Sequence, residues 1–167
     1  MFTRRVALVV FSLGCLGFLL FVGLSAPLLP DRVASHFNAL GEPDGWMSKG
    51  GYLLMTSIMG VALPLFLVGI MYVTRFLQDW MINLPHKEYW LSPEQRPHTN
   101  AYLMGLAFWL GSLLLGLMTG THYLSIEANR SLPVRLPGTS FSVILACFLV
   151  GIAVWCIVLI RRFRKPH

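Results

Sequence analysis

The fold is decided by residues 29–52, which read LPDRVASHFNALGEPDGWMSKGGY. This polar segment lies between two long apolar runs, Val6–Leu29 and Tyr52–Thr74. Two further apolar runs follow, at Ala101–Leu124 and Phe141–Ile160, and none of the runs contains Asp, Glu, Lys or Arg. Each run has about 20 residues or more, enough at ~1.5 Å per residue to cross a hydrocarbon core of ~30 Å. The sequence therefore predicts four membrane-spanning helices.

The overall composition agrees with a membrane protein. The chain is 56% hydrophobic and 12% charged, which is outside the range of soluble globular domains. Buried helices of a soluble bundle would each need a polar stripe, and these apolar runs have none. We expect an all-α integral membrane protein with a single domain over residues 1–167, built from two helical hairpins. The first apolar run is interpreted as a retained helix, because it is longer than the ~7–15 apolar residues of a signal peptide.

Basic residues predict the orientation. Nine of them lie on one side of the four spans: Arg4, Arg5, Arg75, Lys87, Arg96, Arg161, Arg162, Arg164 and Lys165. Four lie on the other side: Arg32, Lys49, Arg130 and Arg135. Because short loops follow the positive-inside bias, we expect a multi-pass protein of the bacterial cytoplasmic (inner) membrane with both termini in the cytoplasm. This topology accounts for the net charge of +6, so we expect lipid, and no nucleic acid, as the partner of the basic tail.

The outer insert, residues 30–51, is expected to be a structured extracytoplasmic loop. Its first part, Arg32–Asn38, is predicted to be extended, with Val33, Ser35 and Phe37 on one face and His36 and Asn38 on the other. Pro43-Asp44-Gly45 supplies turn chemistry.

The end of the insert is expected to begin the second helix. Trp46 and Met47 are expected at the level of the lipid headgroups, and Ser48 is expected to cap the helix. Lys49 near the helix start opposes the helix dipole. We therefore expect it to have a partner, namely Asp44, Glu42, a lipid phosphate or a bound ligand.

Residues 29–49 also carry a recognisable pattern, L-P-x-x-V-x-x-H-F-N-x-x-G-x-P-D-G-W-x-S-K. It resembles the signature of a bacterial family of small membrane proteins of unknown function, whose domain also forms the N-terminal part of SdpI-type immunity proteins. A second string, Asn83-Leu84-Pro85 followed by Tyr89-Trp90-Leu91, is similar to the second motif of that family. The resemblance implies a membrane hairpin around the insert and a role like that of a protein giving immunity to a secreted peptide toxin. This chain is shorter than the larger immunity proteins.

The candidate ligand- or partner-binding residues of the insert are His36, Asn38, Gly41, Glu42, Asp44, Gly45, Trp46 and Lys49. Three interpretations are open. In the first, His36, Asn38 and Asp44 bond one another and the loop backbone and form a rigid lid. In the second, the insert recognises an extracytoplasmic peptide, a lipid or a membrane-protein partner. In the third, His36 and Asp44 join His122 of the third span in a metal site of the kind zinc accepts, although the spacing matches no recognised metal motif.

The cytoplasmic loop, residues 76–100, offers a second set of candidates: Asn83, Pro85, Tyr89 and Trp90. By analogy with SdpI-type proteins, a cytoplasmic regulator is the partner that such a loop would dock. Tyr89 and Trp90 also suit the membrane–water interface. Ser92-Pro93-Glu94-Gln95 is a capping box that predicts a helix start, and Pro97 must bend or restart that helix.

The spans themselves restrict the function. Coupled-ion transporters normally hold ionisable groups at membrane depth, and the nearest here is His122 close to the outer end of the third span. Pro64 predicts a kink in the second helix. We expect a non-enzymatic inner-membrane protein, an immunity-like or accessory factor without a cofactor, that binds a partner through the outer insert. The alternatives are a metal-dependent membrane enzyme or factor using the outer His/Asp cluster, and a small-molecule permease using the kink.

Overall fold

The computed structural model describes residues 4–164, so Lys165 of the basic tail lies outside the described residues. Its helices are α1 (Arg4–Ser25), α2 (Lys49–Val73), the short α3 (Lys87–Trp90), α4 (Arg96–Arg130) and α5 (Gly138–Phe163). Its strands are β1 (Arg32–Phe37) and β2 (Pro43–Ser48). Single 3₁₀ turns follow α1 at Ala26–Leu28 and α2 at Thr74–Phe76, and another lies at Asp79–Met81.

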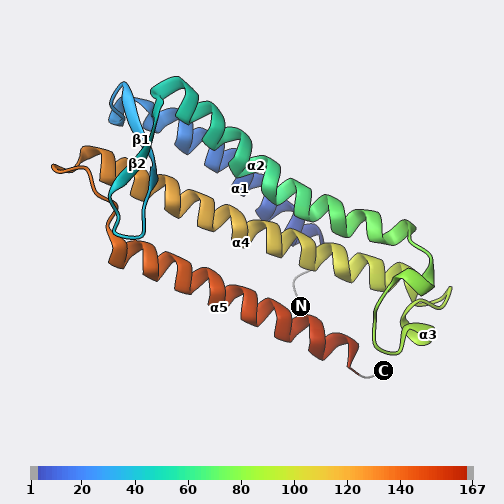
Figure 1. Ribbon diagram of the computed structural model, residues 1–167. Helices are drawn as coiled ribbons and strands as arrows, with labels where there is room; N and C mark the ends of the chain where they lie inside the picture. Colours follow the sequence, from blue (N-terminus) through green and yellow to red (C-terminus); the bar gives the residue numbers. More distant parts are fainter. Residues whose placement is uncertain (1–3, 165–167) are drawn as a thin grey trace.

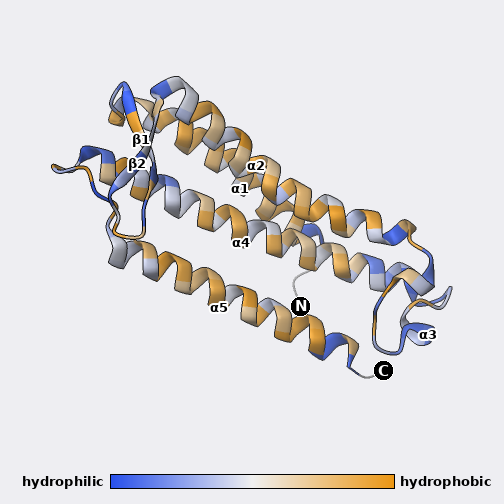
Figure 2. Cartoon of the chain, viewed as in Figure 1, coloured by the Kyte–Doolittle hydropathy of each residue, from blue (hydrophilic) through white to orange (hydrophobic). Residues whose placement is uncertain are grey.

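Among residues 4–164, four helices are long and apolar enough to cross a membrane, as the sequence predicts. With the turns that continue them, these segments are Arg4–Leu28, Lys49–Phe76, Arg96–Arg130 and Gly138–Phe163. Figure 2 shows that their middle parts are hydrophobic and that hydrophilic residues gather toward the two ends of the molecule. The largest difference from the predicted runs is in α4, which continues past Leu124 to Arg130. Ile126 and Ala128 in this extension are buried, so tertiary packing supports the additional turns.

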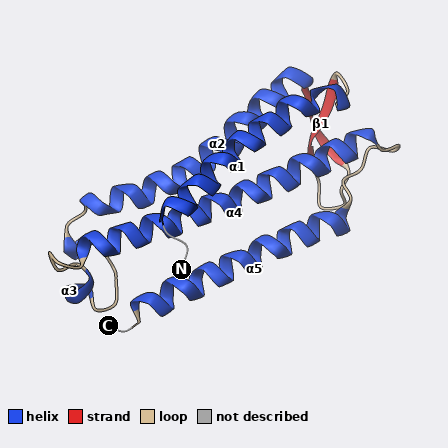
Figure 3. Cartoon of the chain, turned by 180° about the vertical axis from the view of Figure 1, so that it is seen from behind, coloured by secondary structure: helices blue, strands red, loops and turns tan. Residues whose placement is uncertain are grey.

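Helix α4 is the central element. It packs against α1, α2 and α5, whereas α1 and α2 make a less extensive contact with each other. The β1–β2 hairpin lies at one end of the helices, and the loop containing α3 lies at the other end (Figures 1 and 3). Helix α1 begins and helix α5 ends toward the α3 end (Figure 1).

Glycines allow close approach inside the α1–α2–α4 unit. Phe18 of α1 is 2% exposed and packs with Val22 and Leu115. A Cβ built on Gly60 of α2 would lie 2.1 Å from Phe18 Cε1 and 2.2 Å from Phe18 Cζ. The ring therefore occupies the space that any side chain at position 60 would need, which is the role of small residues where membrane helices meet.

Helix α5 packs along α4 through a different set of contacts. A Cβ on Gly120 would lie 3.0 Å from Ile144, and a Cβ on Gly151 would lie 2.8 Å from Leu113. The Trp155 indole Nε1–H donates to Leu106 O at 2.8 Å. Gly116 lies one turn before Gly120 on α4, but a Cβ there would meet no atom within 4 Å. The close contact between α4 and α5 at Gly120 therefore does not continue to Gly116.

Helix α2 continues through Pro64, whose ring is fully buried. Its start agrees with the sequence, because the Ser48 side chain accepts a hydrogen bond from the Gly51 backbone N–H at 3.2 Å. This is the geometry of an N-cap residue.

The two strands are a correction to the purely α-helical expectation. The sequence predicts one extended segment followed by a turn at Pro43-Asp44-Gly45, but these three residues begin β2. The reversal lies earlier, where Asn38 Oδ1 accepts the backbone N–H groups of Leu40 at 2.9 Å and Glu42 at 3.0 Å. Gly41 has a φ of 78°, a conformation that glycine adopts without steric cost. The sheet therefore exists because the polar Asn38 side chain organises the turn.

At the opposite end, the segment before α4 folds back onto the helices. The Arg96 guanidinium donates to Asp79 Oδ1 at 2.5 Å and to Leu77 O at 2.8 Å. The predicted capping box forms a turn in which Ser92 Oγ accepts the Gln95 backbone N–H at 3.4 Å, and α4 begins just after it at Arg96. The Glu94 pKa lies below its ordinary value because the carboxylate accepts hydrogen bonds from its own backbone N–H and from the Ser92 side chain. Pro97 occupies the first turn of α4, a position where the missing N–H has no cost.

Candidate functional site

The β1–β2 hairpin has an inner face against the helices and an outer face. On the inner face, Val33 is completely buried and packs with Tyr52 and Ile126. On the outer face, Arg32 and His36 of β1 and Asp44 and Trp46 of β2 are exposed. The predicted separation of Val33 from His36 onto opposite faces therefore agrees with the burial of the two side chains.

Two side chains from distant parts of the chain fasten the hairpin to the helices. Asn129 of α4 bonds both backbone groups of Ala34: its Oδ1 accepts the Ala34 N–H at 2.7 Å, and its Nδ2 donates to Ala34 O at 3.0 Å. Arg135, between α4 and α5, donates to Leu40 O at 3.2 Å and 3.0 Å. The Leu136 N–H donates to Gly41 O at 2.9 Å. Both the base and the tip of the hairpin are thus held in place.

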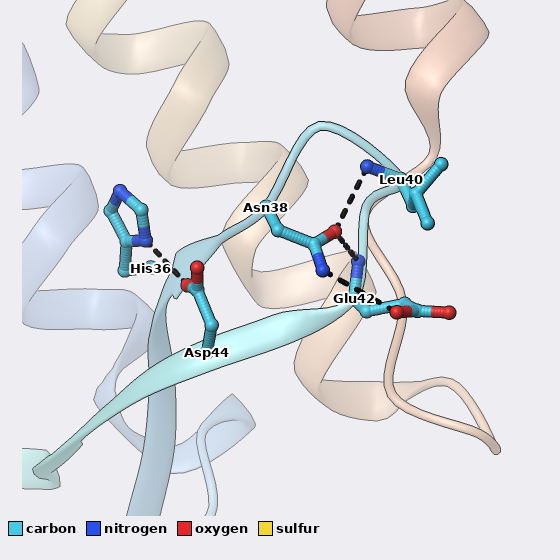
Figure 4. Close-up of polar contacts among 5 residues, drawn as sticks. All are labelled: His36, Asn38, Leu40, Glu42 and Asp44. Atoms are coloured by element: carbon cyan, nitrogen blue, oxygen red, sulfur yellow. Dashed lines mark hydrogen bonds and ion pairs between the residues drawn. The ribbon is translucent and has the colours of Figure 1, made fainter.

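The polar residues of the insert form two separate groups, and not the single network of His36, Asn38 and Asp44 that the rigid-lid interpretation requires. His36 Nδ1 lies 2.5 Å from Asp44 Oδ1, while Asn38 bonds the backbone of Leu40 and Glu42 and lies 3.4 Å from Glu42 Oε2 (Figure 4). The side chains of His36 and Asp44 are 74% and 44% exposed. An ion pair this exposed contributes only ~0–1 kcal/mol to stability. The hairpin is therefore fastened by Asn129 and Arg135, and the His36–Asp44 pair is left on the surface.

The other candidates of the insert have distinct places. Gly41 is packed against Leu136, whose carbonyl oxygen would be 2.8 Å from a Cβ at position 41. Gly45 lies opposite His36, and a Cβ there would be 2.9 Å from His36 Cβ. The Arg32 guanidinium lies 5.3 Å from the centre of the Trp46 ring, within range of a cation–π contact. The outer face therefore presents an arginine stacked on a tryptophan beside a histidine–aspartate pair.

Lys49 has a partner that the sequence did not suggest. Its Nζ lies 3.3 Å from Asp31 Oδ1, and its backbone N–H donates to Asp31 O at 2.9 Å. Asp31 lies just before β1, so this contact closes the open end of the hairpin at the start of α2.

A buried polar cluster lies where α1, α2 and α4 meet beneath the hairpin. His122 is 2% exposed, and its Nε2 lies 2.8 Å from Ser25 Oγ while its Nδ1 lies 2.9 Å from the Tyr52 hydroxyl. Phe21 packs edge-on against the imidazole, with ring centres 5.1 Å apart. Three helices therefore meet on one imidazole ring.

The hydrogen-bond directions decide what this cluster can do. Ser25 Oγ donates to Val22 O at 2.8 Å, so at His122 the serine oxygen accepts from Nε2–H. Nδ1 is then the acceptor of the Tyr52 O–H, and the neutral imidazole is satisfied at both nitrogens. The Ser25–His122 spacing would suit a nucleophile and its base, but Ser25 is 2% exposed and its hydrogen is directed to the backbone. The cluster as arranged joins helices.

A cavity of about 210 Å³ lies beside this cluster, between α2 and α4. Its lining includes Ser35 of β1, Tyr52 and Thr56 of α2, and His122 and Ser125 of α4. Within the described residues, its wall contains hydroxyl, thioether, imidazole and hydrocarbon groups but no charged side chain. The cavity can therefore accommodate water or an uncharged group.

The metal site considered from the sequence is not assembled. His36 pairs with Asp44 on the outer face, whereas His122 is buried and bonds Ser25 and Tyr52. Among residues 4–164, no group of three or more His, Cys, Asp or Glu side chains is placed to hold a metal ion.

The candidates in the loop at residues 76–100 are also divided. Asn83 and Pro85 are exposed, whereas Trp90 is 2% exposed and lies edge-on to Phe163, with ring centres 5.2 Å apart. Tyr89 is half-buried and packs against the Trp90 ring with centres 4.8 Å apart. Trp90 therefore does not present its ring at the surface as an interfacial or docking residue would, because it anchors this loop on the end of α5.

Several residues important to the site were missed by reasoning from the sequence: Ser25, Tyr52, Asn129 and Arg135. Asn129 had one signal, since it is an uncharged polar residue just beyond an apolar run. Nothing local identifies its partner, because Ala34 is 95 positions away.

These features define a helical protein with four candidate membrane spans and a hairpin platform at one end. Residues 13–60 match the family model of a domain of unknown function, DUF1648. The match extends from the middle of α1 through the hairpin to the middle of α2, so it includes Phe18, Ser25, Tyr52 and Gly60 but not His122 or Asn129. No curated protein and no solved structure matches the chain.

Proposed function

We propose that this protein is a non-enzymatic factor of the bacterial inner membrane that binds an extracytoplasmic partner through the outer face of the β1–β2 hairpin. The observation that carries the proposal is that the hairpin backbone is held by other parts of the chain while several of its side chains stay exposed. Asn129 and Arg135 hold its backbone, while Arg32, His36, Asp44 and Trp46 remain exposed. A rigid support lowers the conformational entropy lost on binding, and tryptophan and arginine are enriched among residues that dominate binding energy.

The exposed pair also suits recognition chemically. With His36 Nδ1 bonded to Asp44, the carboxylate orients the imidazole and leaves Nε2 to meet a partner. We expect this pair to contribute little to stability, because the side chains are 74% and 44% exposed. The resemblance to SdpI-type proteins favours a peptide partner and an immunity-like or accessory role, and leaves a cytoplasmic regulator as the partner of the opposite loop.

The proposal requires two helical hairpins with the β1–β2 hairpin outside and both termini in the cytoplasm. Reporter fusions after Lys49, Lys87 and Arg135 are expected to give periplasmic, cytoplasmic and periplasmic signals, because the basic residues are biased to the Lys87 side. A cytoplasmic signal for the fusion after Lys49 would overturn the topology and the proposed function together.

The binding role is tested by a photoreactive amino acid placed at Trp46 in native membranes. A discrete crosslinked product is expected, and His36→Ala or Asp44→Ala should remove it. Both variants should keep the free energy of unfolding within ~0.5 kcal/mol of the parent, because an exposed pair contributes little. Thermal melting in detergent measures this.

The matched control places the same probe at Leu132, which is 96% exposed in the connection between α4 and α5. Equal crosslinking at both positions, or a product that survives both substitutions, would contradict recognition by the outer face. A large loss of stability in either variant would instead support a structural role for the pair.

A further inference from the structure

The end of α2 opposite the hairpin carries an apolar groove. The groove has a volume of about 530 Å³ and is lined by α2 and the residues just after it, including Phe66, Gly69, Ile70, Val73 and Leu77. Gly69 is exposed, and a Cβ built there meets no atom within 4 Å. The glycine therefore leaves a gap between larger apolar side chains along one face of the helix.

An arginine lies beside this groove, where its side chain packs on Tyr72, one of the lining residues. The Arg75 guanidinium lies 5.0 Å from the centre of the Tyr72 ring and 5.3 Å from the centre of the Phe76 ring. Within residues 4–164 Arg75 makes no ion pair, and the nearby Asp79 is paired with Arg96. The rings thus orient an arginine whose charge no carboxylate balances.

The groove and the charge have the spacing of a lipid tail and its phosphate. From Phe66 to Arg75, in the 3₁₀ turn after α2, the chain rises about 14 Å, close to one leaflet of a hydrocarbon core of ~30 Å. An apolar groove on a membrane-spanning helix is in contact with acyl chains, and a guanidinium beside the groove favours a phosphate. Because no ion pair within residues 4–164 balances the charge of Arg75, an anionic headgroup gains more from it than a zwitterionic headgroup, whose own amine offsets its phosphate.

We propose that this end of α2 is a binding site for one anionic phospholipid, with an acyl chain along Gly69 and the phosphate on Arg75. The site is separate from the outer hairpin, and it needs no assumption about which side of the membrane it faces. It differs from the diffuse attraction of a basic tail to a membrane surface, because one groove and one arginine define it.

The test uses the full-length protein in detergent, titrated with phosphatidylglycerol or phosphatidylcholine of identical acyl chains. Bound lipid is counted by native mass spectrometry. The parent is expected to retain phosphatidylglycerol with about fivefold higher apparent affinity, which corresponds to the ~1 kcal/mol attributed to one basic residue near anionic lipid. Arg75→Gln should abolish this preference, whereas Gly69→Phe should weaken retention of both lipids by filling the groove.

Two control variants make the result specific. Gly17→Phe places the same ring at an exposed glycine of α1 that also has open space, and Arg161→Gln removes an exposed charge at the end of α5. Both should retain lipid as the parent does, and all variants should melt as the parent does without added lipid. The proposal is overturned if Arg75→Gln keeps the preference, if Gly69→Phe retains lipid normally, or if the controls lose lipid equally.

Discussion

Asn129→Leu is expected to cost ~2–6 kcal/mol of folding free energy. The substitution keeps a side chain of similar size but removes both hydrogen bonds to the backbone of Ala34, a completely buried residue. Two buried backbone groups are then unpaired, at ~1–3 kcal/mol each. Thermal melting should show the loss, and hydrogen exchange should show faster exchange of the Ala34 amide.

Two further variants distinguish the bonds from general disturbance. Asn129→Asp keeps the acceptor for the Ala34 N–H but sets an oxygen against Ala34 O in place of the donor, so it should still lose stability while the Ala34 amide exchanges more slowly than in Asn129→Leu. Asn83→Leu changes an exposed asparagine at the other end of the molecule and should stay within ~0.5 kcal/mol of the parent. An Asn129→Leu protein with parental melting and parental Ala34 exchange would show that the hairpin is held by other contacts.

The second large effect is expected for Gly60→Ala. An added Cβ would lie 2.1 Å from the Phe18 ring, and that ring is itself packed against Val22 and Leu115. Overpacking of this kind costs ~1–3 kcal/mol, although alanine alone would favour a helix by ~1 kcal/mol. Melting temperature in detergent should therefore fall.

The control for Gly60→Ala is Gly17→Ala, where the Cβ meets no atom within 4 Å and the melting temperature should be unchanged or higher. Phe18→Leu should rescue Gly60→Ala, because a smaller neighbour relieves the clash and the two substitutions are then not additive. If Gly60→Ala melts like Gly17→Ala, helix α2 shifts freely at this position and the close approach has no structural role.

The spans could be predicted because the signal is local and strong. About 20 consecutive apolar residues without charge satisfy the bilayer whatever the neighbouring helices do. The second strand could not be predicted, since Pro43-Asp44-Gly45 is typical of a turn. Asn38 and Gly41 make the turn instead, and pairing with β1 then extends the residues that follow.

The candidate site was partly predictable, because some of its features depend on local sequence alone. From their residue types, His36, Asp44 and Trp46 are expected at the surface of the insert, and the structure leaves them exposed. Which polar groups hold the hairpin depends on contacts between segments far apart in sequence. Ser25, Tyr52 and His122 come from three helices. The pattern of residues within one helix does not predict a contact between side chains of different helices.

The long-range bond between Asn129 and Ala34 has a consequence for biogenesis. A membrane protein is synthesised and inserted from its N-terminus, so α1, the hairpin and α2 are delivered to the bilayer before α4. During that interval the backbone groups of Ala34 lack the amide that they bond in the finished protein, and Tyr52 and Ser25 lack His122. The β1–β2 hairpin therefore reaches its final form only after α4 has been added.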